Sequence, residues 1–262
     1  MTRTIESLVA ALDDIAPLKA AAEWDNTGLL LRGTRPITRV GLCIDLTGPV
    51  LEELRDCDAL VTYHPPIFRG IKRLDGRTPR QETLLQVIRQ GVHLYAPHTA
   101  LDAAPGAMGD WLIEAFRPAA SLVDLRPVQP AAFDPAFGVG RQAQLAPPAS
   151  VRTMLPRIKS WLGLSHVRCA GDLDVLRRSV AVCPGSGGSV LSGRTDFDVL
   201  LTGEMGHHEV LAHVESGGAV VLTDHTNCER GYLPHYAERI RAICPDLAVV
   251  ISSVDRDPLQ VT

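Results

Sequence analysis

The sequence predicts an α/β protein whose two halves are built alike. Short apolar runs typical of buried strands alternate with segments in which apolar residues recur every three to four positions, as in amphipathic helices. A stretch with six prolines, residues 117–150, interrupts this alternation, which resumes after it. Strands alternating with helices are typical of βαβ units. The proline-rich stretch suits a crossover between two domains or a set of edge strands.

The chain opens with a helix that ends near Pro17, because apolar residues from Ile5 to Ile15 share one face. In the rest of the first half, we expect strands at 40–46, 59–64 and 92–98 and helices at 50–57, 78–91 and 108–116. In the second half, we expect strands at 166–171, 179–183, 198–204, 219–225 and 248–254 and helices at 150–162, from about 188, at 207–216 and at 229–243. We assign residues 1–125 and 235–262 to one domain and 126–234 to the other.

Composition argues against several classes of protein. The 262 residues include 26 Lys and Arg against 30 Asp and Glu, a net charge of −4, and only 5% are aromatic, so nucleic acid is not the expected ligand. No apolar run approaches the roughly 20 residues that cross a bilayer, and residues 1–17 lack the pattern of a signal peptide. Six cysteines without a CxxC pair favour free thiols in the cytoplasm.

Several predicted strands end in a residue that can bind a metal. His64, His98, Glu204 and His225 each follow or close an apolar run. Ligands of open α/β sheets bind at the carboxyl ends of the strands, so these side chains can line one crevice, although polar residues are also common at strand ends. With Asp102 and Glu229 they supply the His and carboxylate ligands that suit Zn²⁺, Fe²⁺ or Mn²⁺. His225 and Glu229 share a face if a helix begins near residue 225.

Of three further segments, the first two have two interpretations each. In GEMGHHE, residues 203–209, the side chains of His207, His208 and Glu209 either belong to the functional site or are polar residues at the start of a helix. PGSGGS, residues 184–189, suits an anion-binding loop or a plain tight turn. WDNTGLL, residues 24–30, is a turn that requires no catalysis. A nucleophilic triad is disfavoured because no GxSxG motif occurs.

Seven motifs occur in one order: WDNTGLL, CIDLT, YHPPIF, PHTALDAAPGAMGDWL, CPGSGGS, LTGEMGHHE and HTNCERGYL. This set, from residue 24 to about 233, resembles the NIF-three family, which includes GTP cyclohydrolase 1 type 2 homologs. The chain is similar to the family's short form, without the inserted domain. The resemblance implies two similar α/β lobes with a two-metal site in the cleft between them, and ring-shaped homohexamers.

The resemblance also implies the metal ligands. The family's His-His pair, Asp, His and Glu correspond to positions 63 and 64, Asp102, His225 and Glu229, with Glu229 bridging two ions. Position 63 is Tyr63 here, so the second ion keeps only His225 and Glu229 unless Tyr63, His98 or a histidine of GEMGHHE contributes. A neutral phenol is a poor ligand for Zn²⁺.

The first functional hypothesis is a divalent-metal-dependent hydrolase that activates water against a nucleotide or related heterocycle. His98, Glu204 and His208 are its candidate catalytic residues, with a histidine as the proton relay. The alternative is a non-enzymatic protein that binds metal or a partner, which the loss of a ligand at Tyr63 favours. Nucleic-acid binding through a ring is a weaker idea that the net charge opposes.

Overall fold

The computed structural model describes residues 2–117 and 119–260. The chain divides into two compact units: unit 1 is Met1–Leu101 with Leu233–Arg256, and unit 2 is Asp102–Tyr232 with Asp257–Thr262. Each unit combines a sheet with helices, so the predicted α/β class is confirmed. Among the described residues, no helix combines the length and the hydropathy needed to cross a membrane.

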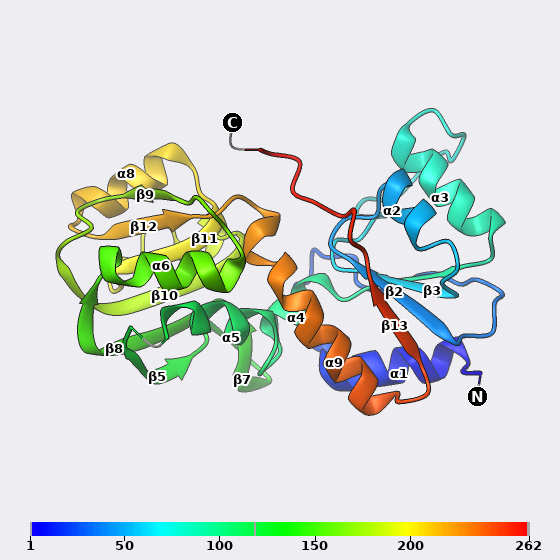
Figure 1. Ribbon diagram of the computed structural model, residues 1–262, viewed down its shortest axis with the longest axis horizontal. Coiled ribbons are helices and arrows are strands. Elements are labelled where there is room, and N and C mark those ends of the chain that lie inside the picture. Colours follow the sequence, from blue (N-terminus) through cyan, green and yellow to red (C-terminus); the bar gives the residue numbers. More distant parts are fainter. Residues whose placement is uncertain (1, 118, 261–262) are drawn as a thin grey trace. The chain divides into compact units, whose positions relative to one another are not determined.

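Unit 1 contains a five-stranded sheet in the order β1-β4-β3-β2-β13. These strands are Gly28–Leu31, His93–Ala96, Ala59–Thr62, Arg39–Cys43 and Ala248–Ile251. The last four run parallel, and β1 lies antiparallel to β4 at the edge. Helices α2 (Gly48–Glu53) and α3 (Pro79–Arg89) lie on one side of the sheet, and α1 (Ile5–Ile15) and α9 (Leu233–Ile243) lie on the other (Figure 1). Because both faces are covered, β2 and β3 are almost entirely buried, which explains their apolar sequences.

Unit 2 contains a six-stranded sheet in the order β5-β8-β10-β11-β12-β9. These strands are Ser121–Arg126, Arg141–Ser150, Leu176–Ser186, Val199–Glu204, Ala219–Leu222 and Arg168–Ala170. Strands β10, β11 and β12 run parallel, and β8 and β9 flank them antiparallel. A separate hairpin joins β6 (Gln129–Ala131) to β7 (Asp134–Val139). The parallel centre brings the carboxyl ends of three strands to one edge.

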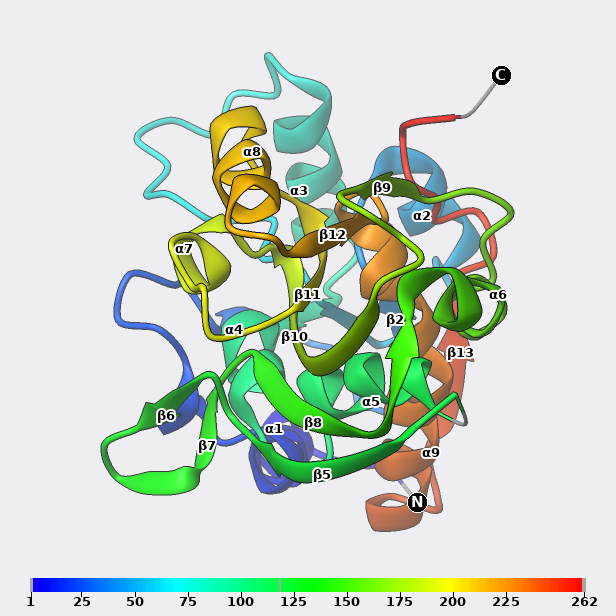
Figure 2. The same ribbon diagram turned by 90° about the vertical axis from the view of Figure 1, so that its left-hand side faces the viewer.

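The helices of unit 2 cover both faces of its sheet. Helices α7 (Gly188–Leu191) and α8 (His207–Glu215) lie on one side, and α5 (Met108–Ile113) and α6 (Val151–Leu162) on the other (Figure 2). Local signals explain α6: the Ser150 side chain accepts from the Thr153 N–H at its start, and Gly163 adopts a left-handed conformation at its end. The short segments α4 (His98–Ala103), η2 (Glu114–Phe116), η3 (Thr226–Cys228) and η4 (Arg230–Tyr232) connect the larger elements. Unit 1 adds η1 (Leu18–Ala20).

The structure differs from the sequence-based expectations at two boundaries. The first division falls between Leu101 and Asp102 and not near residue 125, because α5 packs on β8 and β10 while β5 pairs with β8. The helix expected at 229–243 begins at Leu233, because the residues before it form the short η3 and η4 turns. His225 and Glu229 therefore do not share an α-helix.

The proline-rich stretch forms strands, but one of them is not at an edge. Strand β8 lies between β5 and β10, and its Pro147 and Pro148 fall where the pairing with β10 shifts register. Because proline cannot donate to a ladder, a bulge at this point lets an interior strand contain both residues.

The Arg141 side chain forms several hydrogen bonds within unit 2. It is 1% exposed, and its Nε and Nη2 donate to the two Asp110 carboxylate oxygens at 2.9 and 3.2 Å. Its remaining donors reach the backbone carbonyls of Gly138, Gly140, Ala103 and Ala104. One buried cation thus connects the β7–β8 turn to the segment that follows Asp102.

We expect Arg141→Met to lower the free energy of unfolding of unit 2 by about 3–5 kcal/mol, because it leaves Asp110 and four carbonyls without their buried cation. Urea denaturation followed by circular dichroism measures this loss. Arg126→Met, at an exposed position of β5, is the matched control and should change stability by about 0.5 kcal/mol or less. Equal stabilities of the two variants would contradict the role of Arg141.

Glu53 connects the end of α2 to the chain after β13. Its carboxylate accepts from the hydroxyls of Ser252 and Ser253 and from the Ser253 N–H at 3.0 Å. These hydrogen bonds lower the pKa of Glu53 to about 2. A depressed pKa in the folded state contributes stability above the unfolded value, near 4.5, and this contribution disappears as the pH falls through about 2.

We therefore expect Glu53→Gln to destabilise the protein at pH 7 and to differ less from the parent at pH 3, as measured by urea denaturation at both pH values. Glu52→Gln removes the same charge at the neighbouring exposed position and serves as the control. A pH-dependent difference of the same size in the control would show that the Ser252 and Ser253 contacts are not its cause.

Candidate functional site

His64 follows β3 in unit 1 and is held firmly in place. The backbone N–H groups of Tyr63 and His64 donate to the carbonyls of Cys43 and Ile44 at 2.9 and 3.0 Å, so the pairing with the β2 segment continues past β3. The His64 Nδ1 lies 3.0 Å from Asp45 Oδ1. Because an ionised carboxylate only accepts hydrogen bonds, Nδ1 carries the proton and Asp45 fixes the tautomer of the ring.

His98 has the same arrangement after β4. Its Nδ1 lies 2.8 Å from Asp25 Oδ1, and the backbone N–H of Thr99 donates to the other Asp25 oxygen at 3.2 Å. Burial opposes ionisation of Asp25, but the hydrogen bonds from His98 and Thr99 outweigh it and lower the pKa of this carboxyl. The His98 backbone is left-handed, with φ of 34°, which fixes the ring at the start of α4.

Aromatic rings surround the two histidines of unit 1. The ring centroids of Tyr63, His64 and His98 lie 4.9 to 5.4 Å from one another. Trp24 and Phe68 flank His98 at 6.2 and 6.3 Å. The buried Tyr63 therefore supports both imidazole rings, while its coordination of a metal stays a prediction. Sequence reasoning missed Trp24 and Phe68, which lie in the WDNTGLL and YHPPIF motifs.

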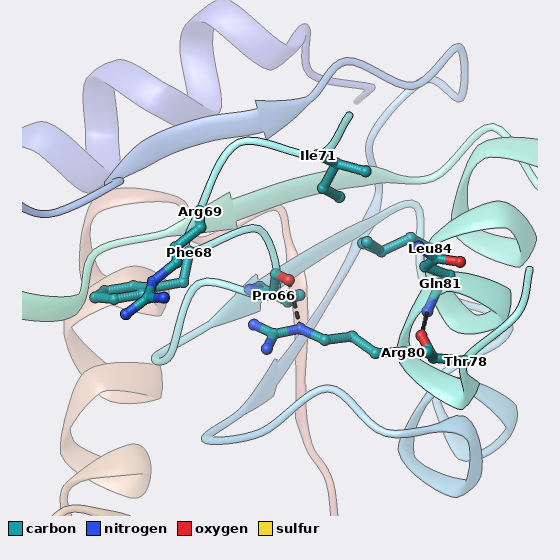
Figure 3. A pocket seen from close by; sticks show the side chains of 8 residues that line it. All are labelled: Pro66, Phe68, Arg69, Ile71, Thr78, Arg80, Gln81 and Leu84. Carbon is teal, nitrogen blue, oxygen red and sulfur yellow. Dashed lines mark hydrogen bonds between the residues drawn. The ribbon is translucent and has the colours of Figure 1, made fainter. Parts of the chain in front are cut away.

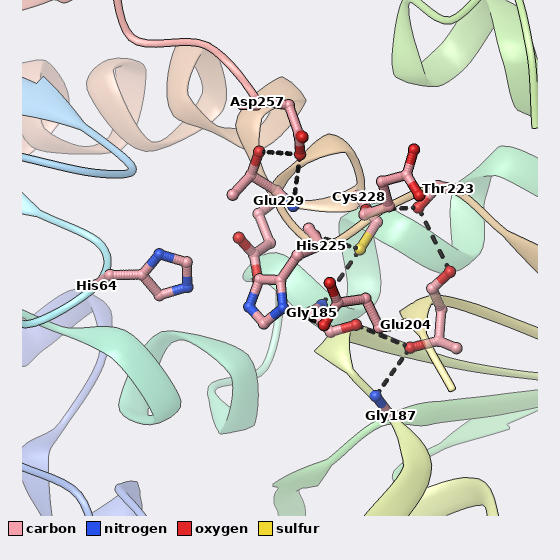
Figure 4. A network of polar contacts seen from close by, with 12 residues as sticks. His64, Gly185, Gly187, Glu204, Thr223, His225, Cys228, Glu229 and Asp257 are labelled. Carbon is pink, nitrogen blue, oxygen red and sulfur yellow. Dashed lines mark hydrogen bonds and ion pairs between the residues drawn. The ribbon is translucent and has the colours of Figure 1, made fainter. Parts of the chain in front are cut away.

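His225 follows β12 in unit 2. Its Nδ1 lies 3.0 Å from Glu204 Oε2, at the end of the neighbouring parallel strand β11 (Figure 4). Because the carboxylate accepts, Nδ1 again carries the proton. Nε2 faces Glu229, whose Oε1 is 3.6 Å away. Two ligands of one tetrahedral zinc ion, with bonds of 2.0–2.1 Å, lie about 3.4 Å apart, so this separation suits two ligands of one ion.

Glu229 is 1% exposed and approaches His225 through a tight backbone turn. The four-residue separation is bridged by η3, a 3₁₀ turn, instead of the α-helix that we expected. Gly185 provides the space: a Cβ there would lie 2.6 Å from Glu229 Oε1 and 3.1 Å from His225 Nε2. Its φ of 60° also favours glycine.

Asp102 lies in the same buried region of unit 2. Burial raises the pKa of the Cys183 thiol well above its usual value, and the carboxylates of Asp102 and Glu229 raise it further. Burial also raises the pKa of Cys228. Both thiols are therefore protonated at neutral pH and are poor metal ligands. The buried Glu229 carboxylate beside the His225 imidazole nitrogen forms part of a donor set that fits a divalent cation.

The remaining predicted site residues have different surroundings. Glu204 holds His225 in place. His208 is exposed on α8, where its ring centroid lies 5.2 Å from that of His207. The PGSGGS segment does not offer the anion-binding loop that we considered, because the Gly185 N–H donates to Cys228 Sγ and the Gly187 N–H donates to Thr202 Oγ1. The segment instead brings backbone close to Glu229.

Sequence reasoning also missed the carboxylates that orient His64 and His98. Asp45 lies within CIDLT and Asp25 within WDNTGLL, and neither was singled out for chemistry. The signal that could have found them is an acidic residue at the same sheet edge as a strand-terminal histidine.

Comparison with known proteins supports the resemblance. The family described as Duf34/NIF3 (NGG1p interacting factor 3) matches residues 3–258. The chain is 39% identical to the Protein NIF3 homolog of Schizosaccharomyces pombe over 96% of both chains. It is 28% identical to the GTP cyclohydrolase 1 type 2 homolog of Clostridium perfringens over 98% of both chains. A hypothetical protein of Staphylococcus aureus has a similar structure, with a TM-score of 0.87 and 21% identity over 100% of both chains. The chain therefore belongs to the Duf34/NIF3 (NGG1p interacting factor 3) family.

Proposed function

We propose that this chain is a divalent-metal-dependent hydrolase that acts on a nucleotide or a related heterocycle. Asp102, His225, Glu229 and His64 are the residues that would hold the metal. The observation that carries the proposal is the pair of His225 and Glu229, whose facing atoms lie 3.6 Å apart beside the space left by Gly185. Zn²⁺, Fe²⁺ and Mn²⁺ all suit this set.

The chain's own residues have separate tasks in this proposal. Asp45 and Glu204 hold the Nδ1–H groups of His64 and His225, so that each Nε2 points in one direction. His98, held by Asp25, is the proposed general acid or base, because its Nε2 remains available to exchange a proton. A bound ion would make water acidic enough to act as a nucleophile near neutral pH.

Glu204 and His208 take different places in the mechanism. We propose that Glu204 acts through His225 as a positioning residue, since its carboxylate bonds the ring. His208, exposed on α8, stays a secondary candidate for proton transfer. The name of the Clostridium perfringens relative supports a reaction that opens a purine ring, with GTP as the first substrate to try.

A second candidate function is a metal-binding protein that recognises a protein partner. The family description names an interacting factor, which favours this alternative. Tyr63, where the resemblance implies a histidine, also favours it, because a weaker second site suits exchangeable binding. Metal-dependent capture of a partner without turnover would support it over the hydrolase.

We also propose that the chain forms homohexamers and works in the cytoplasm. The family resemblance supports the first, and six free cysteines support the second. The net charge of −4 argues against nucleic acid as a partner.

We expect the purified chain to hold one or two divalent ions, and His225→Ala and Glu229→Gln each to lose at least one. The reason is that both changes remove a ligand while Glu229→Gln preserves the size of the buried side chain. Inductively coupled plasma mass spectrometry of protein purified without a tag or chelator measures the content, and GTP-led substrate screening measures turnover.

His208→Ala is the matched control for metal content, since it removes an exposed imidazole. Parent-like metal content in both His225→Ala and Glu229→Gln would contradict the metal site. Full metal loss with unchanged turnover of every substrate would contradict the hydrolase alone.

Gly185→Ala should weaken metal binding by about 10- to 100-fold, because the added Cβ would collide with Glu229 and displace it from His225. Gly193→Ala is a strict control: its φ of 71° is also left-handed, but nothing lies within 4 Å of an added Cβ. Both variants should lose stability through backbone strain. Competition with a metal-binding dye measures affinity, and equal affinities of the two variants would show that the space at Gly185 is unimportant.

A further inference from the structure

Unit 1 contains a basic segment that the metal site does not use. Residues 69–80 have five cations and one acid, a local charge of 5 − 1 = +4 in a chain whose net charge is −4. The cations are Arg69, Lys72, Arg73, Arg77 and Arg80. Such a concentration of charge on an acidic protein favours an anionic ligand.

The arginines of this segment are engaged to different extents. Arg77 pairs with Asp75 at 2.8 Å. Arg80 donates through Nε and Nη2 to the carbonyls of Pro66 and Pro65, at 2.7 and 3.1 Å, which leaves its Nη1 outside these bonds. Within residues 2–117 and 119–260, Arg69 has no ion-pair partner, and it is exposed. Guanidinium groups therefore remain available to an anion.

These free groups border a cavity of about 320 Å³. Arg69 and Arg80 supply its charge, and Phe68, Ile71 and Leu84 supply apolar surface. Figure 3 shows Arg80 reaching from α3 toward Pro66, with Leu84 directed from the same helix toward the loop that contains Ile71. The volume is at the small end of pockets that hold organic ligands.

We propose that this cavity, the Phe68–Arg80 pocket, binds a small organic phosphate that contains a planar ring. Arg69 and the Nη1 of Arg80 bind the phosphate, because guanidinium groups match its geometry and charge. The ring lies against Phe68, Ile71 and Leu84. Assigning this ligand as a substrate rests on the proposed function, whereas its binding does not.

The position of the pocket in unit 1 explains how such a ligand serves that function. Pro65 and Pro66 directly follow His64, and Arg80 holds both of their carbonyls. The ring of Phe68 also contacts that of His98, at 6.3 Å between centroids. A ligand on Phe68 therefore lies beside the histidine that we propose for proton transfer.

The test is isothermal titration calorimetry of the full chain with phenyl phosphate. Arg69→Gln should weaken binding by about tenfold or more, the usual effect of losing a charged hydrogen bond. Arg73→Gln is the matched control, because it removes the same charge from the same segment and does not line the cavity. Equal weakening by both changes would overturn the pocket and show that the segment attracts anions without a defined site.

Two further titrations test the ring and separate the pocket from the metal site. Phe68→Ala should weaken phenyl phosphate binding and leave inorganic phosphate binding unchanged. If the variant weakened the binding of both ligands equally, the proposed contact between Phe68 and the ligand ring would be rejected. Phenyl phosphate should bind chelator-treated protein as it binds untreated protein. Loss of binding after chelation would place the ligand on the metal and overturn the pocket, whereas retained binding in a protein without turnover would reject only the hydrolase.

Discussion

Each of three strand-terminal histidines donates its Nδ1–H to a carboxylate from the adjacent strand at the same sheet edge, and the candidate site depends on this contact. Asp45 follows β2 and meets His64 after β3, while Glu204 ends β11 and meets His225 after β12. Asp25 precedes β1, the antiparallel neighbour of β4, and meets His98. Strands about 4.8 Å apart place such residues within reach of each other. In both sheets, therefore, a hydrogen bond from Nδ1–H to a carboxylate orients the imidazole.

Unit 2 adds a second constraint, because it buries two carboxylates in a region that also holds two protonated thiols. Burial of charge is unfavourable unless a cation or a set of donors compensates it. Gly185 has no side chain to fill the space beside His225 and Glu229. Arg141 donates hydrogen bonds to the carbonyls of Ala103 and Ala104, directly after Asp102. The fold therefore maintains a polar cluster that hydrophobic packing alone would not favour. This arrangement is consistent with a site built for a positively charged ligand.

Much of the secondary structure could be predicted from the sequence, because strands buried on both faces are apolar and capping residues mark the helices. The region from His225 to Glu229 shows where this reasoning fails. A spacing of four residues suggests an α-helix, yet residues 226–228 form a 3₁₀ turn, and His225 lies close to Gly203 while Glu229 lies close to Gly185. The prolines of β8 are a similar case, since only the pairing of neighbouring strands shows where a bulge fits them.

The sequence by itself determined the α/β class, the family resemblance and the residues that end the strands, because apolar periodicity and ordered motifs are local properties. Only the tertiary structure decided that Asp25, Asp45 and Glu204 are the partners of the three histidines, since strand order brings residues together that are 19 to 73 positions apart. It also decided that Gly185 approaches Glu229 and that Phe68, Arg69 and Arg80 border one cavity. Contacts of this kind depend on which strands are neighbours in the sheet. The local sequence pattern does not specify the order of the strands.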